Sequence, residues 1–126
     1  MPPGWKNMIT INRGDIVLVR FPMPDLQQYK PRPVLVIQND ENNIKLKNTI
    51  MLQITTNISN KNLPTQYYID INTDIGKQSG LFDNSVVKAE VIFTLPKDYI
   101  YKKLGFLPSN EIEKIENCLK ISLSLK

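Results

Sequence analysis

The sequence has no histidine and only one cysteine, Cys118, among its 126 residues. The absence of histidine excludes Ser-His-Asp and Cys-His nucleophile systems, and it excludes the histidine pair that many ribonucleases use. A single cysteine cannot form an internal disulfide or build a zinc site alone. Any catalysis must therefore use Arg, Lys, Asp, Glu, Thr, Ser or Tyr side chains, and we expect no metal and no other cofactor.

Long apolar runs are also missing. No run exceeds four residues, whereas a membrane-spanning helix needs about 20, and no apolar stretch of a secretory signal follows the N-terminus. We therefore expect a cytoplasmic protein without membrane contact. The composition, 41% hydrophobic and 22% charged, is typical of one soluble globular domain. The net charge of +4 suits an anionic partner without identifying one.

Period-2 and β-branched segments predict five strands. These cover residues 15–21, 33–37, 49–55, 66–71 and 85–94. The segments between them are expected to be loops or turns, including a long proline-rich loop over 22–33, a polar loop over 40–48 and turns over 76–83. Residues 1–12 are expected to be an extension that precedes a single domain of residues 13–126.

Two helices are expected after the strands. Residues 99–104 form the first, which Gly105 would stop, and the second begins near Asn110, where Glu113 has the spacing of a capping box. One face of the second helix is apolar, with Ile112, Ile115, Leu119 and Leu123. Short strands followed by a terminal helix predict a mainly β fold, either a small antiparallel barrel or a partly open sheet.

Arg32 is one of three arginines and lies between Pro31 and Pro33. Prolines restrict their own backbone and that of the preceding residue, so the chain around Arg32 is stiff. A guanidinium held at the start of a strand suits bidentate contact with a phosphate. A surface arginine in a salt bridge would have the same sequence, and both interpretations stay open.

Two other groups of polar residues lie on or at the ends of strands. Thr55 and Thr56 lie at the end of a core strand, where they could bind a phosphate or a base, or form the turn that ends the strand. Lys88 and Glu90 are two residues apart, so a regular strand would project both to one face. They could be an acid–base pair or an exposed ion pair.

Four blocks of sequence resemble the PemK/MazF family of bacterial toxins. They occur in the family's order and spacing between about residues 13 and 123, and the second, followed by a strand ending in Ile-Thr, is the most specific. The blocks are RGDIVLVRF (13–21), KPRPVLVIQND (30–40), LQITTN (52–57) and SVVKAEVIFTL (85–95).

The resemblance implies an SH3-like barrel with short helices and a C-terminal helix. It also implies a homodimeric toxin of a type II toxin–antitoxin system that a cognate antitoxin neutralises. Such toxins are sequence-specific, metal-independent endoribonucleases (mRNA interferases) that cut single-stranded mRNA by attack of its own 2′-hydroxyl group. That reaction leaves a 2′,3′-cyclic phosphate and a 5′-hydroxyl.

The resemblance also suggests roles for individual residues. Arg32 matches the family arginine that would bind and neutralise the phosphate, and Thr55 matches a threonine that would hold the phosphate or the 2′-hydroxyl. Neighbouring RNA contacts are expected from Lys30, Gln53 and Thr56.

One departure from the family concerns Lys88 and Glu90. One branch of the family has an Arg and an Asp at these positions as acid and base. Lysine lacks the guanidinium fork and glutamate adds a methylene, so we favour a mechanism that relies mainly on Arg32 and Thr55. Two alternatives are a toxin of the same fold that poisons DNA gyrase, and a decayed module that only binds an antitoxin.

Overall fold

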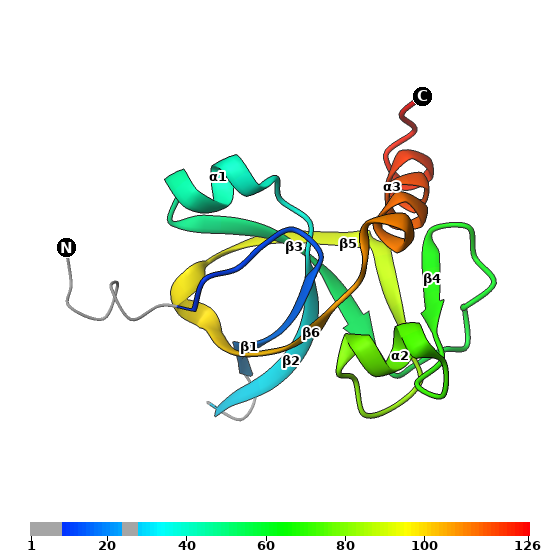
Figure 1. Ribbon diagram of the computed structural model, residues 1–126, viewed down its shortest axis with the longest axis horizontal. Helices are drawn as coiled ribbons and strands as arrows, with labels where there is room; N and C mark the ends of the chain where they lie inside the picture. Colours follow the sequence, from blue (N-terminus) through cyan, green and yellow to red (C-terminus); the bar gives the residue numbers. More distant parts are fainter. Residues whose placement is uncertain (1–8, 24–27) are drawn as a thin grey trace.

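The computed structural model describes the backbone of residues 9–23 and 28–126, and side chains within this part except those of residues 21–30. Six strands and a C-terminal helix dominate the fold (Figure 1). The strands are β1 (Asp15–Met23), β2 (Gln28–Val36), β3 (Asn48–Thr55), β4 (Gln66–Ile69), β5 (Ser85–Pro96) and β6 (Ile100–Phe106). The helices are α1 (Asp40–Lys45), α2 (Asp74–Ser79), the short 3-10 helix η2 (Lys97–Tyr99) and α3 (Ser109–Ser122).

All six strands belong to one antiparallel sheet with the order β4-β5-β3-β2-β1-β6. The sheet curls strongly, but within the described residues β4 and β6 remain unpaired edges, so it is not closed (Figure 1). The prediction of a mainly β fold with short helices and a C-terminal helix is confirmed. Of the two expected forms, the molecule adopts the partly open sheet rather than the closed barrel.

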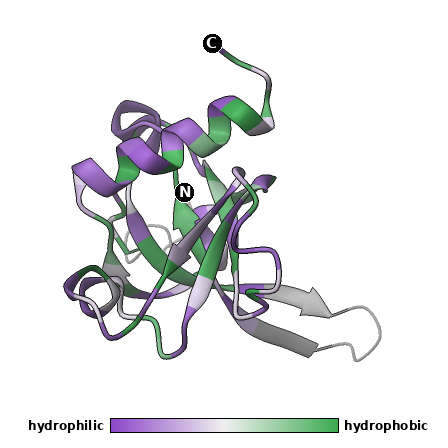
Figure 2. Ribbon diagram, turned by 90° about the vertical axis from the view of Figure 1, so that its right-hand side faces the viewer, coloured by the Kyte–Doolittle hydropathy of each residue, from purple (hydrophilic) through white to green (hydrophobic). Residues whose placement is uncertain are grey.

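Each face of the sheet has its own hydrophobic cluster. The larger cluster lies between the sheet and α3, which crosses the strands as Figure 2 shows. It includes Ile16, Leu35, Leu52, Ile54, Ile69, Val87, Ala89, Ile112 and Ile115. The cluster on the other face consists of Ile11, Val17, Val19, Val34, Val36 and Met51, with Phe93, Leu95 and Ile100 packed against it. Adjacent residues of β3 alternate between the two clusters, as strand geometry requires.

The long loop expected over residues 22–33 is wrong for residues 22–23 and 28–33, and residues 24–27 lie outside the described part of the chain. β1 and β2 form a ladder that continues to the pair Met23–Gln28, so both strands extend into this segment. Pro31 and Pro33 lie where β2 pairs with β1 alone, because pairing with β3 begins only at Val34. A ribbon with one free side tolerates proline at alternate positions, where the missing N–H would face away from the partner strand.

Two segments expected to be loops or turns contain six-residue helices. Asn39 caps α1 by accepting a 2.8 Å hydrogen bond from the backbone N–H of Asn42. Thr73 caps α2 in the same way, and Gly80 ends α2 in the left-handed conformation, with φ of 73°. Neither helix is long enough for apolar periodicity to reveal it, so only the capping residues could have indicated these helices.

The helix expected over residues 99–104 is also wrong, because this segment is strand β6 on the edge beside β1. Gly105 lies inside the strand and does not stop a helix. A Cβ atom there would be 2.1 Å from the carbonyl oxygen of Gln78, so the glycine allows β6 to approach α2 closely.

The C-terminal helix α3 is confirmed, with a different start from the expected one. It begins at Ser109, and the residue that precedes it, Pro108, makes no side-chain capping bond, so the capping box is not formed. Ile112 and Ile115 are buried against the sheet, whereas Leu123 follows the helix and is 51% exposed. No helix in the described part of the chain has the length and apolar character needed to cross a membrane.

Candidate active site

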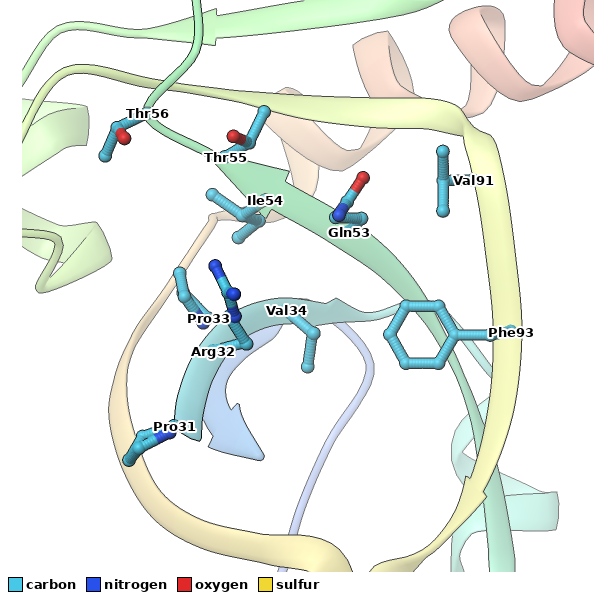
Figure 3. A pocket seen from close by; sticks show the side chains of 10 residues that line it. All are labelled: Pro31, Arg32, Pro33, Val34, Gln53, Ile54, Thr55, Thr56, Val91 and Phe93. Atoms are coloured by element: carbon cyan, nitrogen blue, oxygen red, sulfur yellow. The ribbon is translucent and has the colours of Figure 1, made fainter. Parts of the chain in front are cut away.

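A pocket of about 540 Å³ lies on the face of the sheet opposite α3, between β2, the end of β3 and the second half of β5 (Figure 3). Ten residues line it: Pro31, Arg32, Pro33, Val34, Gln53, Ile54, Thr55, Thr56, Val91 and Phe93. Its volume is in the range of pockets that hold small ligands. The lining combines an apolar wall with four polar side chains.

Strand register brings Arg32 and Thr55 together. The β2–β3 ladder ends at the pair Val34–Gln53, and Arg32 and Thr55 each lie two residues beyond that pair on their own strands. Residues two apart on a strand share a face, so both side chains project from the face of Val34 and Gln53. Figure 3 shows the Arg32 side chain extending from β2 toward the end of β3.

The hydroxyl group of Thr55 has a donor left for a ligand. Its Oγ1 accepts a 3.1 Å hydrogen bond from the backbone N–H of Asn57, which fixes the oxygen at the end of β3. A hydroxyl can donate one hydrogen bond as well as accept, and its own O–H has no acceptor among the described residues. Thr55 is half-buried, so this O–H can point into the pocket.

Arg32 is the single charged residue among the ten that line the pocket. The residue is exposed, so a ligand in the pocket can reach its guanidinium. Together with the Thr55 hydroxyl and the Gln53 amide it forms a donor-rich site next to the ring of Phe93. Such a site favours an anion with three or more acceptor oxygens, such as a phosphate diester, beside an apolar or aromatic group.

Lys88 and Glu90 do not line this pocket. Lys88 is paired with Gln53, so it lies on the pocket's face of the sheet one strand away. The next β3–β5 pair joins Leu52 to Ile92, which leaves residues 89–91 as a bulge. The bulge interrupts the alternation of side chains along β5, so strand geometry no longer places Lys88 and Glu90 on one face. The two side chains form no salt bridge in the described part of the chain.

The carboxylate of Glu90 is held instead by Gln66, whose Nε2 donates a 2.7 Å hydrogen bond to Oε2. Burial alone would raise the pKa of Glu90. The hydrogen bond from Gln66, other hydrogen bonds and the charge of Lys88 outweigh burial and lower this pKa below its ordinary value. A carboxylate with a lowered pKa is a weak base at neutral pH, so Glu90 is poorly suited to accept a proton in catalysis.

The structure thus gathers four of the seven residues that the sequence suggested: Arg32, Gln53, Thr55 and Thr56. Lys88 is one strand away, Glu90 is on the bulge, and the side chain of Lys30 lies outside the described residues. Sequence reasoning missed the apolar wall of Val91 and Phe93. Its position depends on the bulge in β5, for which the sequence carries no turn residue or other local signal.

A second hollow, of about 380 Å³, lies between the start of β1 and α3 and is a weaker candidate. Its arginine, Arg13, already forms a 2.9 Å salt bridge with Glu116 and donates to the carbonyl oxygen of Ile37. The backbone N–H of Arg13 also donates to Asp40. These polar groups are engaged with one another and connect the segment before β1 to α1 and α3.

Comparisons with known proteins agree with the fold. Residues 12–123 match the family model described as "PemK-like, MazF-like toxin of type II toxin-antitoxin system". The chain is also similar to a protein of Staphylococcus epidermidis named Endoribonuclease MazF. The two are 35% identical over 116 residues, which cover 91% of this chain and 92% of that protein.

Solved structures share the fold. One is an endoribonuclease from a mycobacterial species, with a TM-score of 0.72 and 23% identity, covering 94% of this chain and 95% of that one. The Mycobacterium tuberculosis toxin MazF-mt6 has a TM-score of 0.72 and 22% identity, covering 89% and 98%. A MazE-MazF structure from Deinococcus radiodurans has a TM-score of 0.71 and 17% identity, covering 94% and 100%.

Proposed function

The chain belongs to the PemK-like, MazF-like family of type II toxins, and on this premise we propose that it is an endoribonuclease toxin that cuts single-stranded mRNA. The observation that carries the proposal is that Arg32 from β2 and Thr55 from the adjacent strand β3 line one pocket. The 35% identity to a named endoribonuclease over 91% of the chain supports the same activity.

RNA supplies its own nucleophile, so the absence of histidine is no obstacle. The 2′-hydroxyl oxygen attacks the adjacent phosphorus, the bond from phosphorus to the 5′-oxygen breaks, and the products are a 2′,3′-cyclic phosphate and a 5′-hydroxyl. The proton of the 2′-hydroxyl must leave and the 5′-oxygen must gain one. The protein has to align the attacking oxygen with the leaving oxygen and stabilise the negative charge that builds on the phosphoryl oxygens.

We assign that stabilisation to Arg32. Its guanidinium can bind two oxygens of the phosphate at once, and the flanking prolines reduce the backbone freedom lost on binding. Thr55 would donate its free O–H to a phosphate oxygen or to the 2′-oxygen, while its Oγ1 remains fixed by Asn57. Gln53 and Thr56, on the same lining, would contact neighbouring parts of the RNA. Contact of Lys30 with the RNA stays a prediction.

Neither Lys88 nor Glu90 is needed for the first step of this mechanism. The lowered pKa of Glu90 and its engagement with Gln66 argue against a role as the base. The structure supports the mechanism favoured from the sequence, in which Arg32 and Thr55 do most of the work through orientation and charge. Proton transfer to and from solvent completes the reaction.

The proposal extends to partners. A solved mycobacterial endoribonuclease with the same fold is in complex with its cognate antitoxin, and we propose that a cognate antitoxin neutralises this chain as well. We also propose a cytoplasmic homodimer of a single domain spanning residues 13–126. Exposed apolar side chains at the end of α3 and beyond it, Ile121, Leu123 and Leu125, are compatible with contact to a second copy.

The two alternatives are not favoured. A poison of DNA gyrase would not need a donor-rich pocket for a phosphate, and a decayed antitoxin-binding module would be free to lose it. The pocket instead retains both the arginine and the threonine that match the family motif.

The experiment that tests the proposal is incubation of the purified protein with a long single-stranded RNA in EDTA. Primer extension then maps the cut ends, and treatment with a phosphatase that cannot act on cyclic phosphates identifies the 3′ products. Discrete cuts at a short recurring motif, with cyclic 3′ ends, are the expected result. Intact RNA after incubation with folded protein would refute the proposal, and assays of gyrase would follow.

A further inference from the structure

A second group of side chains lies on the same face of the sheet as the candidate active site, two strands from Thr55. Thr55 pairs with Val86 on β5, and Val86 pairs with Tyr68 on β4. Paired residues of an antiparallel sheet project to one face, so Tyr68 and Thr55 share a face. Adjacent strands are about 4.8 Å apart, which gives a separation of roughly 10 Å between the Cα atoms of Thr55 and Tyr68.

A cation already lies on the Tyr68 ring. The Nζ atom of Lys61, from the loop between β3 and β4, is 4.7 Å from the centroid of the ring. Lys61 is exposed and Tyr68 is half-buried, and Lys61 forms no salt bridge in the described part of the chain. An exposed cation–π contact contributes only about two- to five-fold to an equilibrium, so a ligand that stacks on the ring can displace it.

The neighbouring row of the sheet is polar. Gln53, Lys88 and Gln66 are paired across β3, β5 and β4, which places the half-buried Lys88 between the pocket and Tyr68. Lys88 forms no salt bridge with any of the described residues. Gln66 is 8% exposed, and its Nε2 is held by Glu90, so the orientation of its amide is fixed. Its Oε1 is buried and has no hydrogen-bond donor among the described residues.

We propose that Tyr68, Lys61 and Lys88 form a subsite for a nucleotide that flanks the scissile bond of a single-stranded RNA. The Tyr68 ring stacks on the base, and the two ammonium groups contact the phosphate between this nucleotide and the one bound at Arg32. The proposal rests on the proposed function and adds a second contact point for the same strand of RNA.

The combination of residue types supports this assignment. Proteins that bind single-stranded nucleic acid place aromatic rings for base stacking beside cations that follow the backbone. Stacking on an aromatic side chain contributes about five- to 150-fold in affinity per base, more than the cation–π contact that it would replace. The subsite and the pocket share one face without an intervening strand edge, so one strand of RNA can reach both.

The test measures binding separately from cleavage. Fluorescence anisotropy would use a single-stranded RNA oligonucleotide that carries one 2′-deoxy residue at the mapped cut, which removes the nucleophile and blocks the reaction. Tyr68→Leu removes the ring and keeps an apolar side chain over Val86, and we expect it to weaken binding at least five-fold. Tyr68→Phe keeps the ring and should bind as the wild type does.

The two lysines are tested by the salt dependence of binding. Lys61→Gln and Lys88→Gln should each weaken binding several-fold and reduce the slope of log affinity against log salt by about 0.7, the value for one phosphate contact on a single strand. The matched control is Lys120→Gln on α3, on the opposite side of the sheet, which removes the same charge and should leave the slope unchanged.

Three results would overturn the subsite: wild-type affinity of Tyr68→Leu with an unchanged melting temperature, equal losses in Tyr68→Phe and Tyr68→Leu, or unchanged salt slopes in both lysine variants. If Tyr68→Leu does not fold, the phenylalanine and lysine variants still decide. Failure of the proposed function would give a different result, because the wild-type protein itself would then leave RNA uncut in EDTA.

Discussion

The hydroxyl group of Thr55 gives the sharpest test of the site, because it has one structural and one proposed chemical role. Its Oγ1 accepts from the N–H of Asn57, and its O–H is free to donate. Thr55→Val keeps the shape of the side chain and removes both bonds. A variant of this kind separates a residue that only ends a strand from one that binds the phosphate.

The two roles predict effects of different size. The hydrogen bond from the N–H of Asn57 to Thr55 is exposed to solvent, and Asn57 is also held by two hydrogen bonds with Ser59. Loss of the bond to Thr55 should therefore cost no more than about 1 kcal/mol of unfolding free energy. A hydrogen bond to a charged phosphate oxygen is worth about 1.5–3 kcal/mol, which corresponds to roughly a 10- to 150-fold loss of kcat/KM.

The assay combines cleavage of a fluorogenic RNA oligonucleotide with thermal unfolding. We expect Thr55→Val to lose at least 10-fold in kcat/KM while its melting temperature falls by only a few degrees. Thr55→Ser retains the hydroxyl and should keep most of the activity. If Thr55→Val cleaves within about three-fold of the wild-type rate, Thr55 only ends the strand and its assigned role is wrong.

Three further predictions concern groups outside the pocket. Glu90→Gln should retain kcat/KM within about three-fold, because the lowered pKa of Glu90 makes it a weak base; a loss of 100-fold in the cleavage assay would restore it as a catalytic residue. The hydrogen bond from Tyr67 lowers the pKa of Glu111 from 4.5, so protonation of Glu111 should reduce the free energy of unfolding as pH falls below about 4.5. Burial raises the pKa of Tyr67, so stability should also fall as pH rises above about 10, where the tyrosine ionises in the unfolded chain. Denaturant unfolding across pH would show the alkaline loss shrinking in Tyr67→Phe, and an unchanged alkaline profile would contradict this reasoning. Gly76→Ala should destabilise by more than about 2 kcal/mol, since its Cβ would be 2.0 Å from the carbonyl oxygen of Asp70, although helix propensity alone predicts a gain of about 1 kcal/mol; a higher melting temperature would show that this contact relaxes.

Strands could be predicted from the sequence where at least one face of the strand is buried. β3 and the first half of β5 carry apolar residues in the expected alternation, and their bounds agree with the prediction within a few residues. The helix α3 was likewise recognisable, because Ile112 and Ile115 recur at helical spacing and meet the sheet. In these elements, local pattern and tertiary packing favour the same structure.

The errors occur where tertiary contacts override local preference. Residues 100–106 have residue types that also suit a helix, and only pairing with β1 makes them a strand. The segment that contains Pro31 and Pro33 has the composition of a loop, yet it forms a ladder because its free side needs no N–H donor. Neither partner strand can be identified from the segment itself.

The same distinction applies to the site. Arg32 and Thr55 stood out individually, since one is flanked by prolines and the other ends a core strand. That they line one pocket follows from the pairing of Val34 with Gln53, which the sequence does not reveal. The bulge over residues 89–91 interrupts the alternation of side chains after Lys88 and sets the position of Phe93 in the pocket wall, and no local feature of the sequence predicts it.

The central claim is that Arg32 stabilises the phosphate in the transition state, and the most direct test is the single-turnover rate of RNA cleavage by Arg32→Ala and Arg32→Lys in EDTA. Loss of a group that stabilises developing charge costs about 100- to 1,000-fold in rate, and we expect this loss in Arg32→Ala. Arg32→Lys should fall between it and the wild type because lysine keeps the charge without the fork. Arg32 is exposed, so both variants should unfold within about 0.5 kcal/mol of the wild type. Cleavage by folded Arg32→Ala at the wild-type rate would contradict the account.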